Sequence, residues 1–196
     1  MKEFFKQSGI EIDNLKIEKL RAYSEFLKDY NKKVNLTRIT EDNDIIIKHF
    51  IDSVIVLNYI DIPQGAKLVD VGTGAGFPGV PLKIFRPDIE ITLVDSLNKR
   101  IVFLEQLLKL LEIEGDCVHS RGEDLSKNSE YSGQFDIATA RAVAKIPDLK
   151  KYTMGFLKTG GRLLAYKDLK EEITEGNSYI YKLPNGDDRR LIEITK

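Results

Sequence analysis

The sequence contains few of the residues that stabilise a fold through covalent or metal cross-links. Cys117 is the only cysteine among the 196 residues, which excludes an intramolecular disulfide. With one cysteine and two histidines, a structural zinc site is not expected either. We therefore expect a fold held together by its hydrophobic core, no metal in the functional site, and a cytoplasmic location, where thiols stay reduced.

Long apolar stretches and a large excess of one charge are also missing. No apolar run is long enough to span a bilayer, and Met1–Phe5 lacks the apolar core of a signal peptide, so we expect no membrane partner. A dedicated duplex binder is usually basic, whereas the formal net charge here is −1, so DNA is not expected as a partner. An enzyme that contacts structured RNA needs only a local basic face. We expect such a protein to act as a monomer.

A glycine-rich turn that follows a short apolar run is the most informative segment. The run ends in Asp70, and Gly72, Gly74 and Gly76 follow at once. Glycine has no Cβ and accepts positive φ, so this backbone can approach a ligand closely. A second apolar run ends in Asp95, and an acid at that position suits the two hydroxyls of a ribose. Together these features predict a site for a nucleoside-containing cofactor.

The same turn is compatible with two different cofactors. Gly74-x-Gly76-x-x-Gly79 matches the dinucleotide pattern, which leaves an NAD(P)-dependent oxidoreductase open. However, Asp70 precedes Gly72 by two residues, and Asp-x-Gly-x-Gly-x-Gly is typical of S-adenosylmethionine (SAM) methyltransferases. In that interpretation Asp70 orients the methionine ammonium group of SAM; the alternative is that it only caps the turn.

Hydrophobic periodicity predicts helices first and an alternation of strands and helices afterwards. Two amphipathic helices are expected over residues 12–30 and 43–59, before the first strand. Strands are expected at 68–71, 91–94, 117–119, 135–140 and 162–166, with helices at 80–85, 98–111 and 149–157. Gly160-Gly161 is interpreted as a helix cap and turn, and residues 179–183 and 191–194 as a hairpin.

This order predicts an α/β fold with a doubly wound, mostly parallel, Rossmann-like sheet that ends in an antiparallel C-terminal hairpin. Residues 1–62 are predicted to form an N-terminal helical extension packed on the core. Residues 63–196 are predicted to form the cofactor-binding core.

Several segments, in the same order, resemble one family over nearly the whole chain. They are Asn35-Leu36-Thr37, His49-Phe50-Ile51-Asp52-Ser53, Gly76-Phe77-Pro78-Gly79-Val80-Pro81-Leu82, Asp95-Ser96-Leu97-Asn98-Lys99-Arg100, Ser120-Arg121-Gly122-Glu123, Thr139-Ala140-Arg141-Ala142, Ala165-Tyr166-Lys167 and the tail from Lys182 to Arg189. The chain thus resembles the RsmG (GidB) family of bacterial 16S ribosomal RNA guanine-N7 methyltransferases, which are class I SAM-dependent enzymes. One departure is a shortened stretch between Lys167 and Tyr179: either this edge of the sheet is trimmed, or a segment is missing from the sequence.

The resemblance implies methyl transfer from SAM to N7 of a guanine, with 16S ribosomal RNA or the 30S particle as partner. The cofactor-binding residues are predicted to be Asp70, Gly72, Gly74, Gly76, Phe77, Asp95, Ser96, Gly122, Glu123 and Arg141. RNA-binding residues are predicted to be Arg38, His49, Lys99, Arg100, Lys167 and Arg189. Guanine N7 carries no proton, so no catalytic acid or base is nominated, and Arg141 is the nearest candidate.

Alternatives stay open at three of these positions and for the function. Glu123 can be a helix-start acid, Arg141 a structural ion pair, and His49 a packing or hydrogen-bonding residue. A non-catalytic RNA-binding or ribosome-assembly module with a SAM fold is a second functional hypothesis. Methylation of a small molecule is a third.

Overall fold

The computed structural model describes residues 1–170, 173 and 175–196. Its helical elements are α1 (Lys2–Gln7), α2 (Asn14–Val34), α3 (Asp42–Asp44), the π-helix η1 (Ile45–Ile51), α4 (Asp52–Val54), the 3-10 helix η2 (Ile55–Asn58), α5 (Gly79–Phe85), α6 (Asn98–Leu111), α7 (Gly122–Leu125) and α8 (Ile146–Thr153). Its strands are β1 (Lys67–Val71), β2 (Glu90–Asp95), β3 (Asp116–His119), β4 (Phe135–Arg141), β5 (Leu157–Lys167), β6 (Asn177–Lys182) and β7 (Asp188–Thr195).

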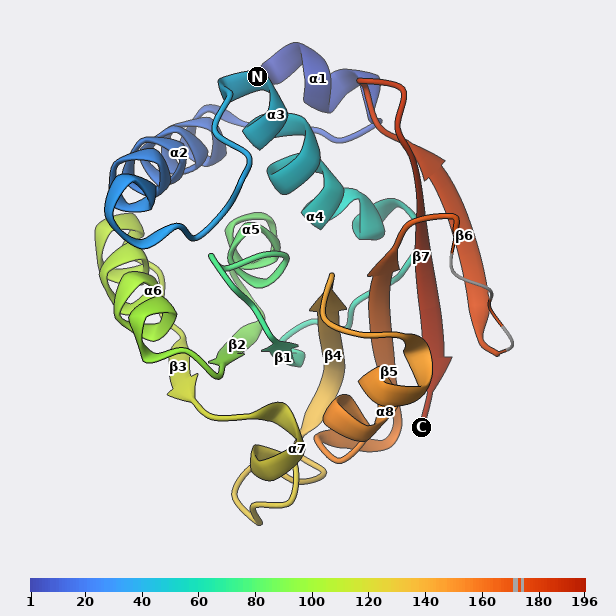
Figure 1. The fold of residues 1–196 in the computed structure, drawn as a ribbon. Helices are drawn as coiled ribbons and strands as arrows, with labels where there is room; N and C mark the ends of the chain where they lie inside the picture. The colour runs from blue at the N-terminus through green and yellow to red at the C-terminus, as the bar shows by residue number, and fades with distance from the viewer. Residues whose placement is uncertain (171–172, 174) are drawn as a thin grey trace.

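The strands form one sheet with the order β3-β2-β1-β4-β5-β7-β6. Strands β1 to β5 are parallel, whereas β7 runs antiparallel to both β5 and β6. The chain moves outward from β1 through β2 to β3 and then returns to β4 on the other side of β1. The predicted doubly wound, mostly parallel sheet with a C-terminal hairpin is confirmed (Figure 1).

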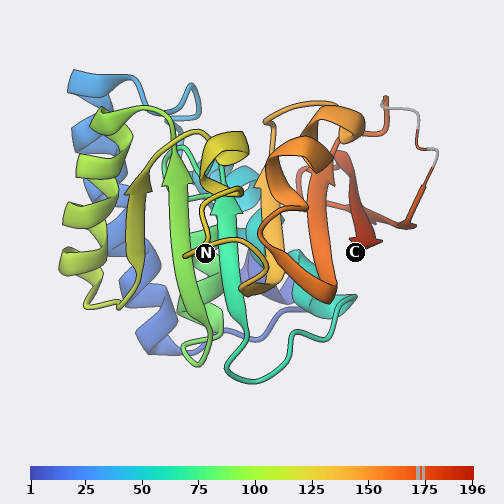
Figure 2. The same ribbon diagram turned by 90° about the horizontal axis from the view of Figure 1, so that it is seen from below.

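Alternate residues of the central strands face two separate hydrophobic clusters, as expected for a sheet covered on both sides. Leu68 and Ile137 belong to the larger cluster with α2, α5 and α6, whereas Val69 and Ala138 face α7 and α8. Figure 2 shows α7 and α8 in front of the sheet and α2 beside α6 at its β3 end. The carboxyl ends of the parallel strands lie together at one edge of this sandwich.

The first helices of the chain share the larger cluster with the sheet. Phe50, Ile51 and Val54 are fully buried in it, and Tyr166 of β5 donates a hydrogen bond to the carbonyl of Ser53 at 2.7 Å. The helices that precede β1 therefore cover the sheet directly. The boundary between residues 62 and 63 stays a prediction. Among the described residues, no helix combines the length and apolar character needed to cross a membrane.

Three local expectations need correction. The helix predicted over 43–59 is a composite of α3, η1, α4 and η2, with a π-helical middle. The helix predicted over 149–157 begins earlier, at Ile146, with Pro147 in its first turn, and Leu157 already belongs to β5. Gly160-Gly161 does not cap a helix: it lies inside β5, opposite the register shift between Phe135 and Ile137.

The stretch that departs from the family pattern is described in part. After β5 ends at Lys167, residues 168–170 and 175–176 form turns and bends that lead to β6. Residues 171, 172 and 174 lie outside the described part of the chain, so the cause proposed for the shortening stays a prediction.

Candidate functional site

The glycine turn lies at the carboxyl end of β1, next to β4, where the winding of the sheet reverses. Ligands of open α/β sheets bind at such switch points. Gly72, Gly74 and Gly76 have φ of +69°, +64° and +96°, a region that favours glycine. No described atom lies within 4 Å of the position that a Cβ of Gly74 would occupy. The backbone at Gly74 therefore faces open space, as a cofactor cradle requires.

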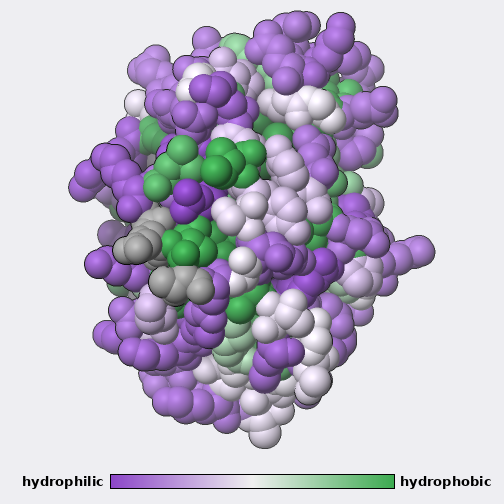
Figure 3. Space-filling model, turned by 90° about the vertical axis from the view of Figure 1, so that its right-hand side faces the viewer, coloured by the Kyte–Doolittle hydropathy of each residue, from purple (hydrophilic) through white to green (hydrophobic). Residues whose placement is uncertain are grey.

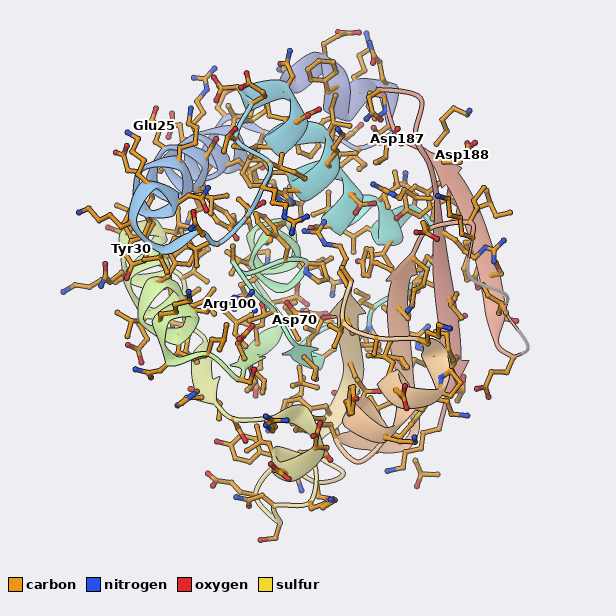
Figure 4. All side chains as sticks on the ribbon, in the orientation of Figure 1. Glu25, Tyr30, Asp70, Arg100, Asp187 and Asp188 are labelled. Carbon is orange, nitrogen blue, oxygen red and sulfur yellow. The ribbon has the colours of Figure 1, made fainter. Side chains whose placement is uncertain are left out.

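Asp70 is fully buried beneath this turn, near the centre of the molecule (Figure 4). Its carboxylate accepts hydrogen bonds from the Thr73 hydroxyl at 2.6 Å, the Gly79 N–H at 3.0 Å and the Thr139 hydroxyl at 2.9 Å. Burial raises the pKa of Asp70, and these three donors counteract that effect. Asp70 thus joins β1, β4 and the start of α5, which shapes the turn. Direct orientation of the SAM ammonium group by Asp70 stays a prediction.

Asp95 at the end of β2 is nearly buried and points back to the glycine turn. Its carboxylate accepts from the backbone N–H of Gly74 at 2.9 Å and of Leu97 at 3.0 Å. Arg100, in the first turn of α6, donates to it at 3.1 Å. Asp95, which was predicted to bind the ribose, and Arg100, which was predicted to bind RNA, therefore form one ion pair beside the glycine turn.

The other predicted cofactor residues lie around the same edge. Ser96 is exposed beside Asp95, and its carbonyl lies 3.0 Å from His119 Nε2. A Cβ on Gly122 would lie 2.6 Å from the Val71 side chain, so α7 starts in close contact with the end of β1. Glu123 is half-buried and pairs with Arg121 at 3.8 Å. Their adenine and ribose contacts stay predictions.

Arg141 ends β4 and is held by three acceptors from the segment that contains η1 and α4. One guanidinium nitrogen donates to the Lys48 carbonyl at 3.0 Å and to the Asp52 carboxylate at 3.1 Å. The other lies 3.0 Å from His49 Nδ1. The guanidinium also lies over the Phe77 ring, 5.1 Å from its centroid, next to the glycine turn.

His49 is neutral in this arrangement. Burial and the nearby Arg141 charge lower the pKa of His49 from 6.5 to about 3. Arginine can only donate, so Nδ1 accepts and the proton resides on Nε2, which lies 2.9 Å from the Thr37 hydroxyl. The ring also stacks on Phe77 with 4.3 Å between centroids. His49 therefore connects the Asn35-Leu36-Thr37 loop to Phe77, which follows the glycine turn.

Asp52 is the centre of the cluster and was not among the predicted site residues. One carboxylate oxygen accepts from Arg141, and the other accepts from the Tyr181 hydroxyl at 2.8 Å and lies 4.0 Å from Arg189 Nε. The spacing of His49 and Asp52, three residues apart on one helix, is a sequence feature that would have indicated it. Tyr181 has no comparable local pattern, because β6 brings it in from the far end of the chain.

A cavity of about 530 Å³ opens between this cluster and the ends of β4 and β5. It is lined by Ile39, Lys48, His49, Asp52, Arg141, Ala142, Val143, Ala144, Lys145, Tyr166, Lys167, Asp168 and Arg189. Four of the predicted site residues therefore share one cavity: His49, Arg141, Lys167 and Arg189. Its volume lies in the range of small-molecule pockets, and most of its charged groups are cationic.

The remaining RNA-binding candidates lie elsewhere. Lys99 and Arg100 are on α6, and Lys99 Nζ lies 3.4 Å from the Val34 carbonyl at the end of α2. Arg38 is exposed in the loop that follows α2, near Thr37. Their RNA contacts stay predictions. Within the described part of the chain, no group of three or more His, Cys, Asp and Glu side chains forms a candidate metal site.

The fold and this edge of the sheet define a Rossmann-like methyltransferase whose glycine turn and Asp95 suit SAM. The family model described as rRNA small subunit methyltransferase G (GidB) matches residues 16–184. The chain belongs to this family, as the resemblance of its motifs predicted. Membership also confirms the enzyme class, a SAM-dependent methyltransferase, and does not favour an NAD(P)-dependent oxidoreductase.

Relatives and one solved structure agree with this assignment. A ribosomal RNA small subunit methyltransferase G of Lactococcus lactis is 42% identical over 203 positions, covering 95% of this chain and 85% of the relative. That of Desulfitobacterium hafniense is 47% identical over 170 positions, covering 85% and 70%. A SAM-dependent methyltransferase structure from Aquifex aeolicus shares the fold, with a TM-score of 0.60 at 14% identity, and covers 83% of this chain and 98% of that one.

Proposed function

We propose that this protein transfers the methyl group of SAM to N7 of a guanine in 16S ribosomal RNA. The observation that carries the proposal is the cavity of about 530 Å³ beside the glycine turn, lined by Arg141 and further cations. It lies where the cofactor and the acceptor meet in open α/β sheets. The family and the names of its relatives support an RNA acceptor.

The chemistry makes few demands on acid–base groups. SAM supplies an electrophilic methyl group bound to a sulfonium, and guanine N7 has a lone pair and no proton to remove. The N7–carbon bond forms as the sulfur–carbon bond breaks, so positioning of the two atoms in line contributes most. The neutral His49 and the satisfied Asp52 agree with a site that has no general base.

Arg141 is the residue that we place closest to the transfer. Its guanidinium is fixed by Lys48, His49 and Asp52, so it does not reorganise when a base enters. Because it reaches Phe77 as well as the cavity, it holds the acceptor side against the cofactor side. Asp52 balances its charge and keeps the guanidinium from repelling the positive charge that moves onto the purine.

The rim of the cavity suits an RNA backbone around an unpaired or extruded guanine. Lys48, Lys145, Lys167 and Arg189 all line it. Such long cations bind phosphates without reading sequence, whereas the cavity itself receives the base. This distribution supports ribosomal RNA as the acceptor over an uncharged small molecule, for which a cationic rim has no use.

The experiment that tests the proposal uses radiolabelled SAM with three acceptors. Unmethylated 30S particles, protein-free 16S RNA and free guanosine are incubated with the protein, and the labelled nucleotide is mapped. We expect label at one guanine N7 in the 16S RNA of at least one of the first two acceptors. Label on free guanosine at an equal rate would contradict an RNA acceptor. SAM binding without label on any acceptor would support the non-catalytic module.

A further inference from the structure

Helix α2 of the predicted extension reaches the glycine turn through one side chain. Tyr23 is fully buried, and its hydroxyl donates a hydrogen bond to the carbonyl of Ala75. Ala75 stands between Gly74 and Gly76, which both have positive φ. Burial raises the pKa of Tyr23 well above its ordinary value, so the hydroxyl stays protonated and remains a donor.

The ring of Tyr23 supports the end of the same turn. It stacks on Phe77 with 5.2 Å between centroids and an interplanar angle of 7°. A Cβ on Gly76 would lie 2.6 Å from the Tyr23 hydroxyl oxygen. The missing side chain of Gly76 therefore leaves the space into which the tyrosine hydroxyl fits, and the helix and the turn are matched in shape.

The other hydrogen bonds described for the turn do not reach the Ala75 carbonyl. The N–H groups of Gly76 and Phe77 bond to the Thr73 carbonyl, and the Gly74 N–H bonds to Asp95. These contacts hold the start and the end of the turn, whereas the Ala75 carbonyl is held by Tyr23. The peptide between Ala75 and Gly76 is thus held at its N–H by Thr73 and at its carbonyl by Tyr23. Without the tyrosine hydroxyl it keeps one of these two hydrogen bonds, and the conformational freedom of Gly76 lets the backbone facing the cofactor shift.

We propose that Tyr23 is a positioning residue for SAM: it holds the Ala75 carbonyl and supports Phe77, so that the glycine turn is preorganised for the cofactor. The predicted extension then contributes to cofactor binding as well as covering the sheet. This inference rests on the SAM dependence of the protein and not on the identity of the RNA nucleotide. Preorganisation of this kind strengthens binding because the turn loses less freedom when the ligand enters.

The test compares Tyr23→Phe with Tyr30→Phe. The first removes only the hydroxyl that holds Ala75 and keeps the stacked ring. The second makes the same chemical change on the same helix, where Tyr30 packs on Phe103 of α6 instead of the glycine turn (Figure 4). SAM affinity is measured by calorimetry, and the kinetic constants for SAM and RNA are measured separately on the full chain.

We expect Tyr23→Phe to raise the Kd and KM for SAM about tenfold, because the buried carbonyl of Ala75 loses its donor. We expect kcat at saturating SAM and the KM for RNA to stay within about twofold, and Tyr30→Phe to match the wild type. A purely structural tyrosine would lower the melting temperature and the active fraction while leaving the Kd for SAM unchanged. That result would overturn the inference. The calorimetry measures SAM binding alone, so it tests the role of Tyr23 even if no guanine is methylated. A failure of the proposed function can therefore be told apart from a failure of this inference.

Discussion

The cofactor end and the acceptor end of the site are built in different ways. At the cofactor end, the buried carboxylates of Asp70 and Asp95 are bound to backbone N–H groups and hydroxyls of the same sheet edge. At the acceptor end, Lys145, Lys167 and Arg189 surround an open cavity. The difference agrees with the ligands proposed for the two ends, because fixed backbone suits a small ligand of constant shape, whereas long charged side chains suit a large polyanion.

Arg141 and Phe77 are where the two ends meet. Phe77 follows the glycine turn and stacks on His49, and Arg141 lies over Phe77 and lines the cavity. The face on the side of β6 differs from this interior contact: Figure 3 shows it as mostly hydrophilic with small, separate hydrophobic patches, and Ile180 is 59% exposed there. We therefore expect the largest losses of activity from substitutions where Arg141 and Phe77 meet.

Replacement of Arg141 should give the largest effect. Arg141→Ala removes the group that joins both ends and leaves the buried Asp52 with only the longer, 4.0 Å contact to Arg189, so we expect kcat/KM for RNA to fall about 100-fold. Arg141→Lys should restore little, since a lysine cannot reach three acceptors in one plane. Steady-state methylation with melting curves for both variants checks this. Activity near wild type in the folded alanine variant would contradict it.

Because the pKa of His49 is lowered in the folded protein, the stability of the protein should depend on pH. In the unfolded chain the histidine takes up a proton near pH 6.5, whereas the folded protein resists protonation down to about pH 3. The stabilisation is thus fully present above pH 6.5 and is lost as the pH falls toward 3. Between pH 7 and 5 the free energy of unfolding should drop about 2 kcal/mol more in the wild type than in His49→Gln. Parallel denaturant titrations measure this, and equal drops would show that His49 is not held neutral.

The cofactor end is tested with two glycines in matched surroundings. Gly74 and Gly65 have φ of +64° and +67°, and neither would place a Cβ within 4 Å of a described atom. Alanine therefore introduces similar backbone strain at both positions. Only Gly74→Ala adds a methyl group to the space in front of the turn, and we expect it to weaken SAM binding about tenfold. Equal SAM affinities of the two variants would remove Gly74 from the cofactor site.

Substitutions of two arginines should distinguish the cofactor end from the acceptor end, with smaller effects than those above. Arg189 lies at the cavity rim, so Arg189→Gln should raise the KM for RNA about fivefold and lessen its dependence on salt. Arg100 pairs with Asp95, so Arg100→Gln should weaken SAM binding about threefold and change the KM for RNA less. Calorimetry with SAM and RNA kinetics at two salt concentrations tell the variants apart. If Arg100→Gln affected RNA alone, its assignment to the RNA side would stand.

Local patterns predicted the elements whose side chains repeat regularly. The bounds expected for α6 were right, and β1, β2, β4 and the hairpin were placed to within a few residues, because amphipathic spacing identifies a buried face. The π-helical turn at His49 and the bulge at Gly160 were missed. The bulge depends on the register of β5 against β4, which spacing within β5 does not reveal, and the π-helix carries the Lys48 carbonyl that accepts from the distant Arg141.

The sequence by itself determined the class of fold, the cofactor and the family. Glycines that allow positive φ and acids that end two strands are local features, and their chemistry is independent of the remaining contacts. Only the tertiary structure decided which charges act together. It placed Asp52 between Arg141 and Tyr181, 89 and 129 residues away, and brought Tyr23 to the glycine turn. Long-range pairs of this kind follow from strand order and helix packing, and spacing along the chain does not encode them.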